Sequence, residues 1–258
     1  MSPDIEIIGD GCAALSLAAR ASELDYNIRL IEPSNAPTTN DHVWGFWSDP
    51  ILAAAQQLAR ATWQKWAIIT HNDCAVLSSD TRPYNAFKRS DWSEHCKGLA
   101  ELSKVTIVAE HEWEKSADSL LFDTRPPVVP SDCMLQHFQG IEVKTKQPCF
   151  DKDMAILMDF RVDQSKGMHF IYLLPYSTTE ALVESTLFST ELVDEEFYST
   201  SIESYLKEHC KVEEFSITHQ EKGVIPLGKL APHDAKIPGL GSNAGATRPA
   251  SGYAFLFI

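Results

Sequence analysis

The first thirty residues alternate between short apolar runs and an alanine-rich stretch. The apolar run Ile5–Ile8 predicts a buried strand, and the run Ile28–Glu32 predicts a second one. Between them, Ala13–Leu24 is rich in alanine and leucine and predicts a helix. A glycine-containing turn joins the first strand to the helix, which completes a strand, turn, helix and strand unit.

Weaker patterns continue this mixed character up to residue 123. Helices are predicted at 50–60 and 91–102, and strands at 67–70, 74–77, 105–109 and 119–123. The middle of the chain then changes to a hydrophobic period of two. The segments 154–161, 168–174 and 181–189 alternate apolar and polar residues and are joined by short polar linkers, which predicts an antiparallel meander with two distinct faces.

An amphipathic acidic helix is predicted after the meander, at 194–209. Its expected buried stripe consists of Phe197, Ile202, Tyr205 and Leu206. The chain then returns to a glycine-rich segment at 239–252. We therefore expect an α/β protein in which a Rossmann-like nucleotide-binding domain is interrupted by an inserted antiparallel β-sheet domain. The predicted boundaries are 1–60, 100–130 and 235–258 for the first domain, and 61–99 and 131–234 for the second.

The turn after the first strand matches the dinucleotide-binding pattern G-x-G-x-x-G/A. Gly9 permits the tight turn, Gly11 lets the backbone approach a pyrophosphate, and Ala14 allows the helix to pack closely on the strand. Glu32 ends the second strand, where an acid can hydrogen-bond ribose hydroxyls. We expect this unit to hold the ADP half of FAD. The alternative is an ordinary strand–turn–helix with chance glycines.

Composition and charge exclude several classes of function. The formal net charge is −14 and the pI is about 5.0, which argues against nucleic acid because a phosphate backbone requires a basic surface. The six cysteines are scattered singly, which favours reduced thiols over disulfides or a metal site. No signal peptide and no apolar stretch of roughly 18 residues is present. We expect a soluble protein or one bound peripherally to a membrane.

Glu184 lies on the last strand of the predicted meander, on the same face as Leu182, Thr186 and Phe188. If that face lines a cavity, desolvation raises the pKa of the carboxyl and makes it a proton donor at neutral pH. The patterning alone favours the other interpretation, a solvated strand glutamate paired with a neighbouring cation. Both remain open at this stage.

The closing segment 241–253 is a second glycine-rich loop that is predicted to lead into a helix. Such loops supply backbone donors to a flavin or a phosphate, and a plain surface turn is the alternative. The residues expected to contact the cofactor here are Gly241, Gly245, Pro249 and Gly252.

An ordered series of motifs resembles the lycopene cyclase family of carotenoid biosynthesis, from Ile5 to the last residue. The matching segments are the Gly9 turn with Leu15–Ala18, Trp44–Trp47, Asp123–Pro127, Gln136–Gly140, Leu157–Arg161, Leu173–Pro175, Leu182–Thr186, Gly223–Pro226 and Arg248–Tyr253. The last of these resembles the Pro-Ser-Thr-Gly-Tyr stretch of the family, with Ala250 and Ser251 as departures.

The resemblance implies an FAD-binding fold related to flavin hydroxylases and an intramolecular lyase or isomerase reaction without net redox. Reduced FAD, with NAD(P)H as electron source, would assist protonation of a terminal double bond of lycopene, and ring closure and proton loss would give β-ionone rings and β-carotene. The Leu-Val-Glu motif places the family's catalytic acid on Glu184. Ser185 stands where plant-type relatives carry a second glutamate, so an assisting role of that acid is not carried over.

The resemblance further implies lycopene or a related acyclic carotenoid as substrate, taken up by a cytoplasmic protein at a membrane surface. Family members continue beyond the Gly-Tyr segment, whereas this chain ends five residues after Tyr253, and we expect a shortened form. Two alternatives remain. One is an FAD-dependent monooxygenase or reductase acting on another lipid, and the other is an inactive flavin-binding fragment.

Overall fold

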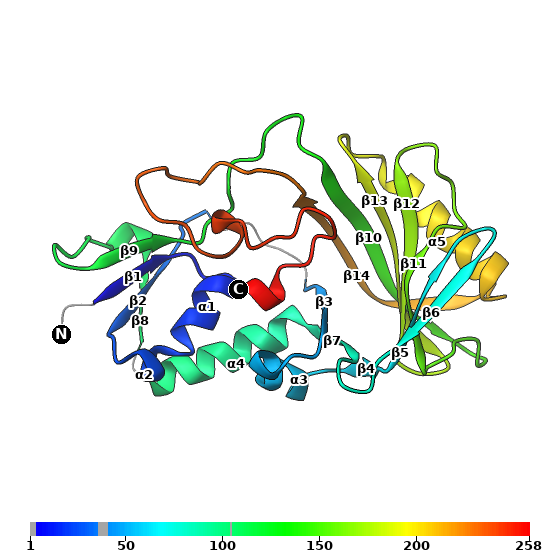
Figure 1. The fold of residues 1–258 in the computed structure, drawn as a ribbon, viewed down its shortest axis with the longest axis horizontal. Coiled ribbons are helices and arrows are strands. Elements are labelled where there is room, and N and C mark those ends of the chain that lie inside the picture. The colour runs from blue at the N-terminus through cyan, green and yellow to red at the C-terminus, as the bar shows by residue number, and fades with distance from the viewer. Residues whose placement is uncertain (1–3, 36–40, 104) are drawn as a thin grey trace. The chain divides into compact units, whose positions relative to one another are not determined.

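The computed structural model describes residues 4–35, 41–103 and 105–258, which form two compact units (Figure 1). Unit 1 is assembled from Met1–Thr39, Arg89–Cys133 and Leu227–Ile258. Unit 2 is assembled from Asn40–Lys88 and Met134–Pro226. Each unit is therefore built from segments that are far apart in the sequence.

Unit 1 contains a four-stranded parallel sheet with the strand order β8-β2-β1-β9. Its strands are β1 (Ile5–Ile8), β2 (Ile28–Glu32), β8 (Thr106–Ala109) and β9 (Leu120–Asp123). Because all four strands run in the same direction, the turn after β1, the end of β2 and the end of β9 meet at one edge. Ligands of open α/β sheets bind at this carboxyl edge.

Three helices belong to this unit, namely α1 (Cys12–Ala18), α2 (Ala21–Leu24) and α4 (Arg89–Leu102). The apolar faces of α1 and α4 pack together over the β1–β2 strands. The single helix predicted at 13–24 is wrong in detail, because the chain breaks into α1 and α2. The amide of Arg20 bonds to Leu17 O in a tight final turn, which ends α1 before α2 begins.

Unit 2 contains a seven-stranded sheet in the order β14-β10-β13-β12-β11-β5-β6. Its strands are β5 (Lys65–Ile69), β6 (Cys74–Ser78), β10 (Leu135–Thr145), β11 (Met154–Asp159), β12 (Met168–Pro175), β13 (Glu180–Ser189) and β14 (Phe215–Pro226). The predicted meander is confirmed as β11, β12 and β13. The long strands β10 and β14 were not predicted, and they extend the sheet beyond β13.

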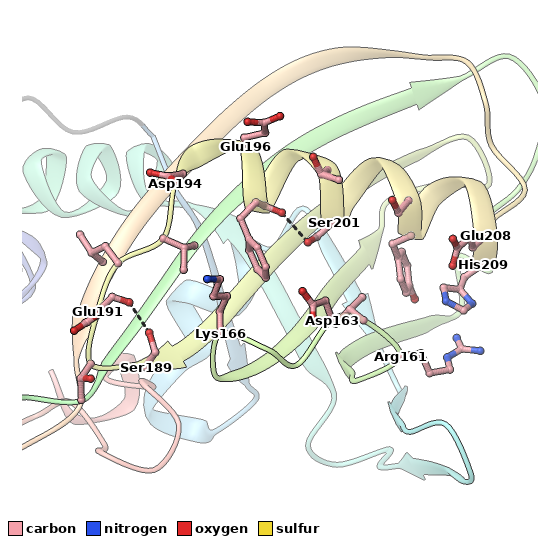
Figure 2. Close-up of a pocket in the computed structure, with 18 residues that line it drawn as sticks. Arg161, Asp163, Lys166, Ser189, Glu191, Asp194, Glu196, Ser201, Glu208 and His209 are labelled. Carbon is pink, nitrogen blue, oxygen red and sulfur yellow. Dashed lines mark hydrogen bonds between the residues drawn. The ribbon is translucent and has the colours of Figure 1, made fainter.

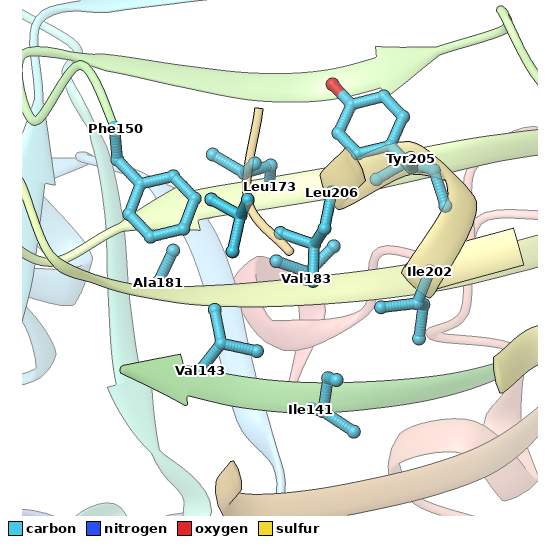
Figure 3. Packing of buried hydrophobic residues seen from close by; sticks show 11 residues of the cluster. Ile141, Val143, Phe150, Leu173, Ala181, Val183, Ile202, Tyr205 and Leu206 are labelled. Atoms are coloured by element: carbon cyan, nitrogen blue, oxygen red, sulfur yellow. The ribbon is translucent and has the colours of Figure 1, made fainter. Parts of the chain in front are cut away.

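Helix α5 (Glu195–His209) covers one face of this sheet (Figure 3). Ile202 and Leu206 of the helix pack against Ile141, Val143 and Val183 of the sheet. The predicted stripe is right for Ile202, Tyr205 and Leu206. It is wrong for Phe197, which is half-buried, because the neighbouring Tyr198 turns inward and hydrogen-bonds His137 Nδ1 at 2.6 Å.

A hydrogen-bonded ion pair fixes the helix to the sheet. Asp159 at the end of β11 is fully buried and accepts hydrogen bonds from the Arg161 guanidinium at 2.9 and 2.6 Å. The hydroxyl of Tyr205 on α5 donates to the same carboxylate at 2.8 Å. Burial alone raises the pKa of Asp159, but these donors outweigh it and lower the pKa overall. Asp159 and Arg161 of the Leu157–Arg161 motif therefore have a structural role, because they hold α5 against the sheet.

A second sheet, of three strands, covers the other face. Its order is β3-β7-β4, with β3 (Val43–Trp47), β4 (Ala61–Trp63) and β7 (Tyr84–Lys88). The short helices η1 (Pro50–Leu52) and α3 (Ala53–Gln57) lie between β3 and β4. The indole of Trp63 donates to Pro175 O at 3.2 Å, and a side chain at Gly45 would collide with Tyr84 and approach the Tyr172 hydroxyl. The two sheets therefore lie in close contact.

Four segments lie in a different unit from the one predicted, and the two shorter ones, 131–133 and 227–234, belong to unit 1. Residues 41–60 belong to unit 2, because β3 pairs with β7 rather than extending the parallel sheet. Residues 89–99 belong to unit 1, because α4 packs against α1. The helix expected after the closing glycine loop is also absent from 241–258, where only the 3-10 turns η3 (Gly241–Ala244) and η4 (Phe255–Phe257) occur. A further 3-10 turn, η2 (Glu110–Glu112), precedes β9.

Candidate functional site

The two glycines of the first turn have different surroundings. Gly9 has a φ of 128°, and a Cβ there would collide with Oγ1 of Thr124. Gly11 precedes α1 with an ordinary φ of −80°, and no atom lies within 4 Å of the position that its Cβ would take. The fold itself therefore requires glycine at position 9. At position 11 the fold leaves open space at the carboxyl edge of the sheet.

Ala14 and Glu32 occupy the positions that the dinucleotide pattern assigns to them. Ala14 is fully buried in the unit 1 core, where a larger side chain would separate α1 from the sheet. Glu32 ends β2 and is exposed, and no hydrogen bond joins its carboxylate to any residue that the structure describes. The carboxylate is available to a ligand at the same edge.

The closing glycine loop comes to this edge as well. Gly241 has a φ of 63°, and its missing Cβ would lie 2.5 Å from Cβ of Ala13 in α1. Asn243 holds the loop in place, since its amide donates to Asp123 O at 3.1 Å and its Oδ1 accepts from the His233 amide at 2.8 Å. The structure thus brings Gly241 to the turn of Gly9 and Gly11, from which it is more than 200 residues away in the sequence.

The rest of the closing loop is more exposed. Gly245 and Gly252 have φ values of 81° and 73°, so both adopt the left-handed conformation that glycine favours. Pro249 lies in an exposed turn, which the Arg248 amide closes by bonding to Tyr253 O at 2.9 Å. These three positions have geometric reasons for their residue types, and no contact of theirs indicates a ligand.

Sequence reasoning missed one group at this edge, Arg125. Its guanidinium is fixed by Asp123 through hydrogen bonds of 3.0 and 2.8 Å, and these raise the pKa of Arg125 above its usual range. Asp123–Pro127 is among the motifs of the family resemblance, but no role at the site was predicted for Arg125. An Asp-x-Arg spacing at the end of a predicted strand was the signal available.

Glu184 on β13 is buried, with 9% of its surface exposed. The Thr186 hydroxyl donates to Glu184 Oε1 at 2.5 Å, and no cation pairs with the carboxyl among the described residues. Burial raises its pKa to about 7, and the Thr186 hydrogen bond offsets this only in part. The interpretation as a solvated, cation-paired glutamate is therefore wrong. Alternation along the strand defines two faces, but it does not say which one a second sheet covers.

The strand register places Glu184 in a row across the sheet. Tyr172 on β12 and Gly140 on β10 are its direct partners, and Glu221 on β14 is the next partner beyond Gly140. Tyr172 also hydrogen-bonds the hydroxyl of Tyr84 from the three-stranded sheet. A second buried acid and two tyrosines therefore lie close to Glu184 on the same face.

Glu221 is 2% exposed and is the acid that sequence reasoning missed. Its Oε2 accepts the Val43 amide at 2.9 Å, and His219 Nε2 lies 3.5 Å away and 2.8 Å from Asp41 O. Its Oε1 is buried without a hydrogen bond to any described residue. Burial, reinforced by the charge of Glu184, raises the pKa of Glu221 to about 9.

A third acid on this face, Glu142, is neutralised by a cation. Arg60 Nη1 lies 2.5 Å from Glu142 Oε1, and the Arg60 guanidinium stacks 3.8 Å above the ring of Tyr176. Among the described residues, Glu184 has no such partner and Glu221 has only the His219 ring, 3.5 Å away. On this face, the charge of Glu142 is therefore paired with Arg60, whereas the raised pKa values of Glu184 and Glu221 favour their protonated forms.

Position 185 lies on the opposite face of β13 from Glu184. Ser185 is fully buried and its hydroxyl is 2.8 Å from His169 Nε2, whose other ring nitrogen lies 2.7 Å from Asp163 O. An acid at this position would point away from Glu184. The substitution of serine for the second glutamate of plant-type relatives therefore leaves the surroundings of Glu184 unchanged.

A cavity of about 830 Å³ in unit 2 is a different place (Figure 2). It runs along α5, and Glu184 does not line it. Its lining mixes charged side chains, such as Asp163, Glu196 and Lys166, with apolar ones such as Leu192 and Phe197.

No cluster of three or more potential metal-ligating side chains occurs within residues 4–35, 41–103 and 105–258. In the same ranges, every helix is too short or too polar to cross a bilayer.

Solved structures place the fold in one class. A geranylgeranyl bacteriochlorophyll reductase-like protein from Thermoplasma acidophilum matches 98% of this chain and 74% of its own, with a TM-score of 0.72 and 12% identity. A flavin-dependent brominase matches 99% of this chain and 75% of its own, with a TM-score of 0.67 and 12% identity. The chain has the α/β fold of flavin-dependent hydroxylases and reductases, as the sequence predicted.

Sequence comparison narrows this class to one family. The family model for lycopene cyclase protein matches residues 4–257, and the chain belongs to the lycopene cyclase family. A lycopene beta-cyclase from Paracoccus sp. is 25% identical over 98% of this chain and 70% of its own length. The chloroplastic lycopene beta cyclase of Arabidopsis thaliana is 26% identical over 97% of this chain and 56% of its own. The chain thus spans between about half and two thirds of the length of such relatives.

Proposed function

We propose that the protein is an FAD-dependent lycopene cyclase in which Glu184 donates the proton that starts ring closure. One observation carries the proposal. The acid of the Leu-Val-Glu motif is a buried carboxyl that has no cation partner in the described part of the chain and lies on a sheet face covered by a second sheet, so it holds its proton near neutral pH. The membership of the chain in the lycopene cyclase family supplies the reaction class.

The carboxyl edge of unit 1 fits the ADP half of FAD. Gly11 leaves space for a pyrophosphate to approach the backbone, and Glu32 has a free carboxylate for ribose hydroxyls. Gly241 lies beside the start of α1 and can contribute backbone groups from the closing loop, with Gly245, Pro249 and Gly252 further along it. Arg125, held by Asp123 at the same edge, offers a positive charge for a phosphate.

In the proposed reaction, Glu184 transfers its proton to a terminal double bond of lycopene. The O–H bond breaks, a C–H bond forms, and the resulting carbocation closes a six-membered ring through a neighbouring double bond. Loss of one ring proton gives a β-ionone ring, so the product is an isomer of the substrate. A positioned general acid contributes about 10²–10⁴-fold to such a step. When bound, reduced FAD would supply negative charge that stabilises the cation.

The same proposal includes an acyclic carotenoid taken from a membrane to which the protein binds peripherally, and NAD(P)H as the source of electrons for the flavin. The plant relatives are named as chloroplastic proteins. For this protein we propose a cytoplasmic location. These parts follow from the family and not from any particular contact.

The test is expression in a bacterium that accumulates lycopene, followed by chromatography of the pigments. The chain, a chain extended by the C-terminal segment of a relative, and the Glu184→Gln variant of each are compared. We expect conversion to cyclic products of unchanged mass by an active parent and at least about 10²-fold less by its variant. Glu180→Gln serves as the matched control, since Glu180 lies on the same strand in an exposed ion pair with Lys144.

In heavy water, each new ring should carry one deuterium. A product of altered mass would instead indicate a monooxygenase or reductase. Flavin uptake without conversion by either chain would indicate a fragment without turnover. Equal conversion by an active parent and its Glu184→Gln variant would exclude Glu184 as the acid.

A further inference from the structure

Glu184 and Glu221 come from strands that are not neighbours in the sheet, and only Gly140 separates them. A methyl group at Gly140 would lie 3.1 Å from Cγ of Glu221, 3.3 Å from Cδ1 of Leu182 and 3.4 Å from Cβ of Glu184. Glycine on the middle strand therefore leaves the space into which both acidic side chains extend. A side chain on β10 at this point would separate them.

The two buried carboxyls have fewer hydrogen-bond partners than their oxygens can accept. The carboxyl of Glu184 receives one hydrogen bond, from Thr186, and Glu221 receives its amide bond on Oε2 alone. Glu221 Oε1 is buried and unpartnered among the described residues, which is costly for a carboxylate oxygen unless it carries or accepts a proton. Two negative charges this close and this deeply buried are unfavourable, so the pair retains one proton.

We propose that Glu221 is a positioning residue that shares a proton with Glu184 across Gly140 and so keeps the donor protonated. This inference rests on the proposed function. When Glu184 gives its proton to carbon, the charge left behind is divided between two carboxyls, and the proton released by the ring returns to the pair. No proton is consumed overall, as an isomerisation requires.

Several charged or titratable groups of the described residues lie around the two acids. Glu142 on β10 is paired with Arg60, Asp41 and His42 precede β3, and His219 lies on the same strand as Glu221. Tyr176 lies near both acids, and Tyr172, which hydrogen-bonds Tyr84, is the strand partner of Glu184. The Nε2 of His219 is committed to the Asp41 carbonyl, which can only accept, so Nε2 carries its hydrogen. Burial raises the pKa of Tyr176, so this phenol stays neutral.

The first test reads the protonated carboxyls directly, without substrate, by infrared spectroscopy during a pH titration. In the parent we expect one buried carboxyl to lose its proton near pH 7 and another near pH 9. Glu221→Gln should leave only the lower step. Glu184→Gln should leave one step at a pH below 9, because the neighbouring charge that raises it is gone. If the step that remains in Glu184→Gln stays near pH 9, or if Glu221 titrates near pH 4.5 in the parent, the two acids do not share a proton.

The second test is the pH profile of cyclisation. At pH 6 both acids are protonated, and Glu221→Gln should cyclise at the parent rate. At pH 9 about half of the parent pairs still hold one proton, which Glu184 can carry, whereas a Glu184 beside glutamine has lost its own, so the variant should be at least about fivefold slower. A purely structural role would lower the rate by the same factor at every pH, which would overturn the proposal. If the parent does not cyclise lycopene at all, the proposed function fails, while the infrared titration still decides the pairing.

Discussion

Replacing Glu184 by glutamine should make the folded protein more stable at alkaline pH. The pKa of Glu184 rises from 4.5 in the unfolded chain to about 7 in the folded one. Each pH unit between these values is worth about 1.4 kcal/mol, so above pH 7 the ionised side chain costs the folded state roughly 3 kcal/mol. Glutamine carries no charge, and the Thr186 hydroxyl can still donate to its amide oxygen.

The sign follows from proton binding. Between pH 4.5 and 7 the folded protein holds a proton that the unfolded chain has released, so the free energy of unfolding of the parent falls as the pH rises through this window. The variant lacks the part of this dependence that Glu184 contributes, whereas Glu221, whose pKa of about 9 lies above this window, contributes within it in both proteins. The advantage of the variant should be near zero at pH 4 and reach its full value by pH 8.

Denaturant unfolding of parent, Glu184→Gln and the control Glu180→Gln at pH 4.5, 6 and 8 measures this difference. The exposed Glu180 pair should change stability by no more than about 1 kcal/mol and without a step in this window. A Glu184→Gln advantage that is absent, or that does not grow between pH 4.5 and 8, would mean that Glu184 is hydrated. The argument for it as a neutral-pH acid would then fail.

Other variants test the remaining parts of the molecule. Gly9→Ala should lower the unfolding midpoint, because its Cβ meets Thr124, whereas Gly11→Val should leave the midpoint unchanged and abolish FAD uptake measured by absorbance. Glu32→Ala should weaken FAD binding by about 1.5–3 kcal/mol in a titration without loss of stability; unchanged affinity would remove it from the site. Tyr205→Phe should lower the free energy of unfolding by about 1.5–3 kcal/mol, because the buried Asp159 loses a hydrogen bond. An unchanged free energy in a denaturant titration would contradict a stabilising role of this hydrogen bond.

The sequence alone determined those features that depend on residues close together in the chain. The first strand–turn–helix–strand unit was predictable, since Gly9, Gly11, Ala14 and Glu32 lie within one short segment of fixed geometry. The meander of β11, β12 and β13 was predictable as well, because its strands alternate and its connections are short. The motif series indicated the family.

Only the tertiary structure decided which face of β13 is buried and what lies beside Glu184. Alternation assigns Glu184 to a face, but the face is buried because a small sheet from residues 43–88 covers it. Glu221 reaches Glu184 because β10 pairs with β13 on one side and β14 on the other. Pairings between distant segments leave little local trace in a sequence, since their register is set by long-range hydrogen bonding and packing. The family resemblance drew attention to position 185, where plant-type relatives carry a second glutamate, whereas the fold turns Ser185 toward the opposite face from Glu184.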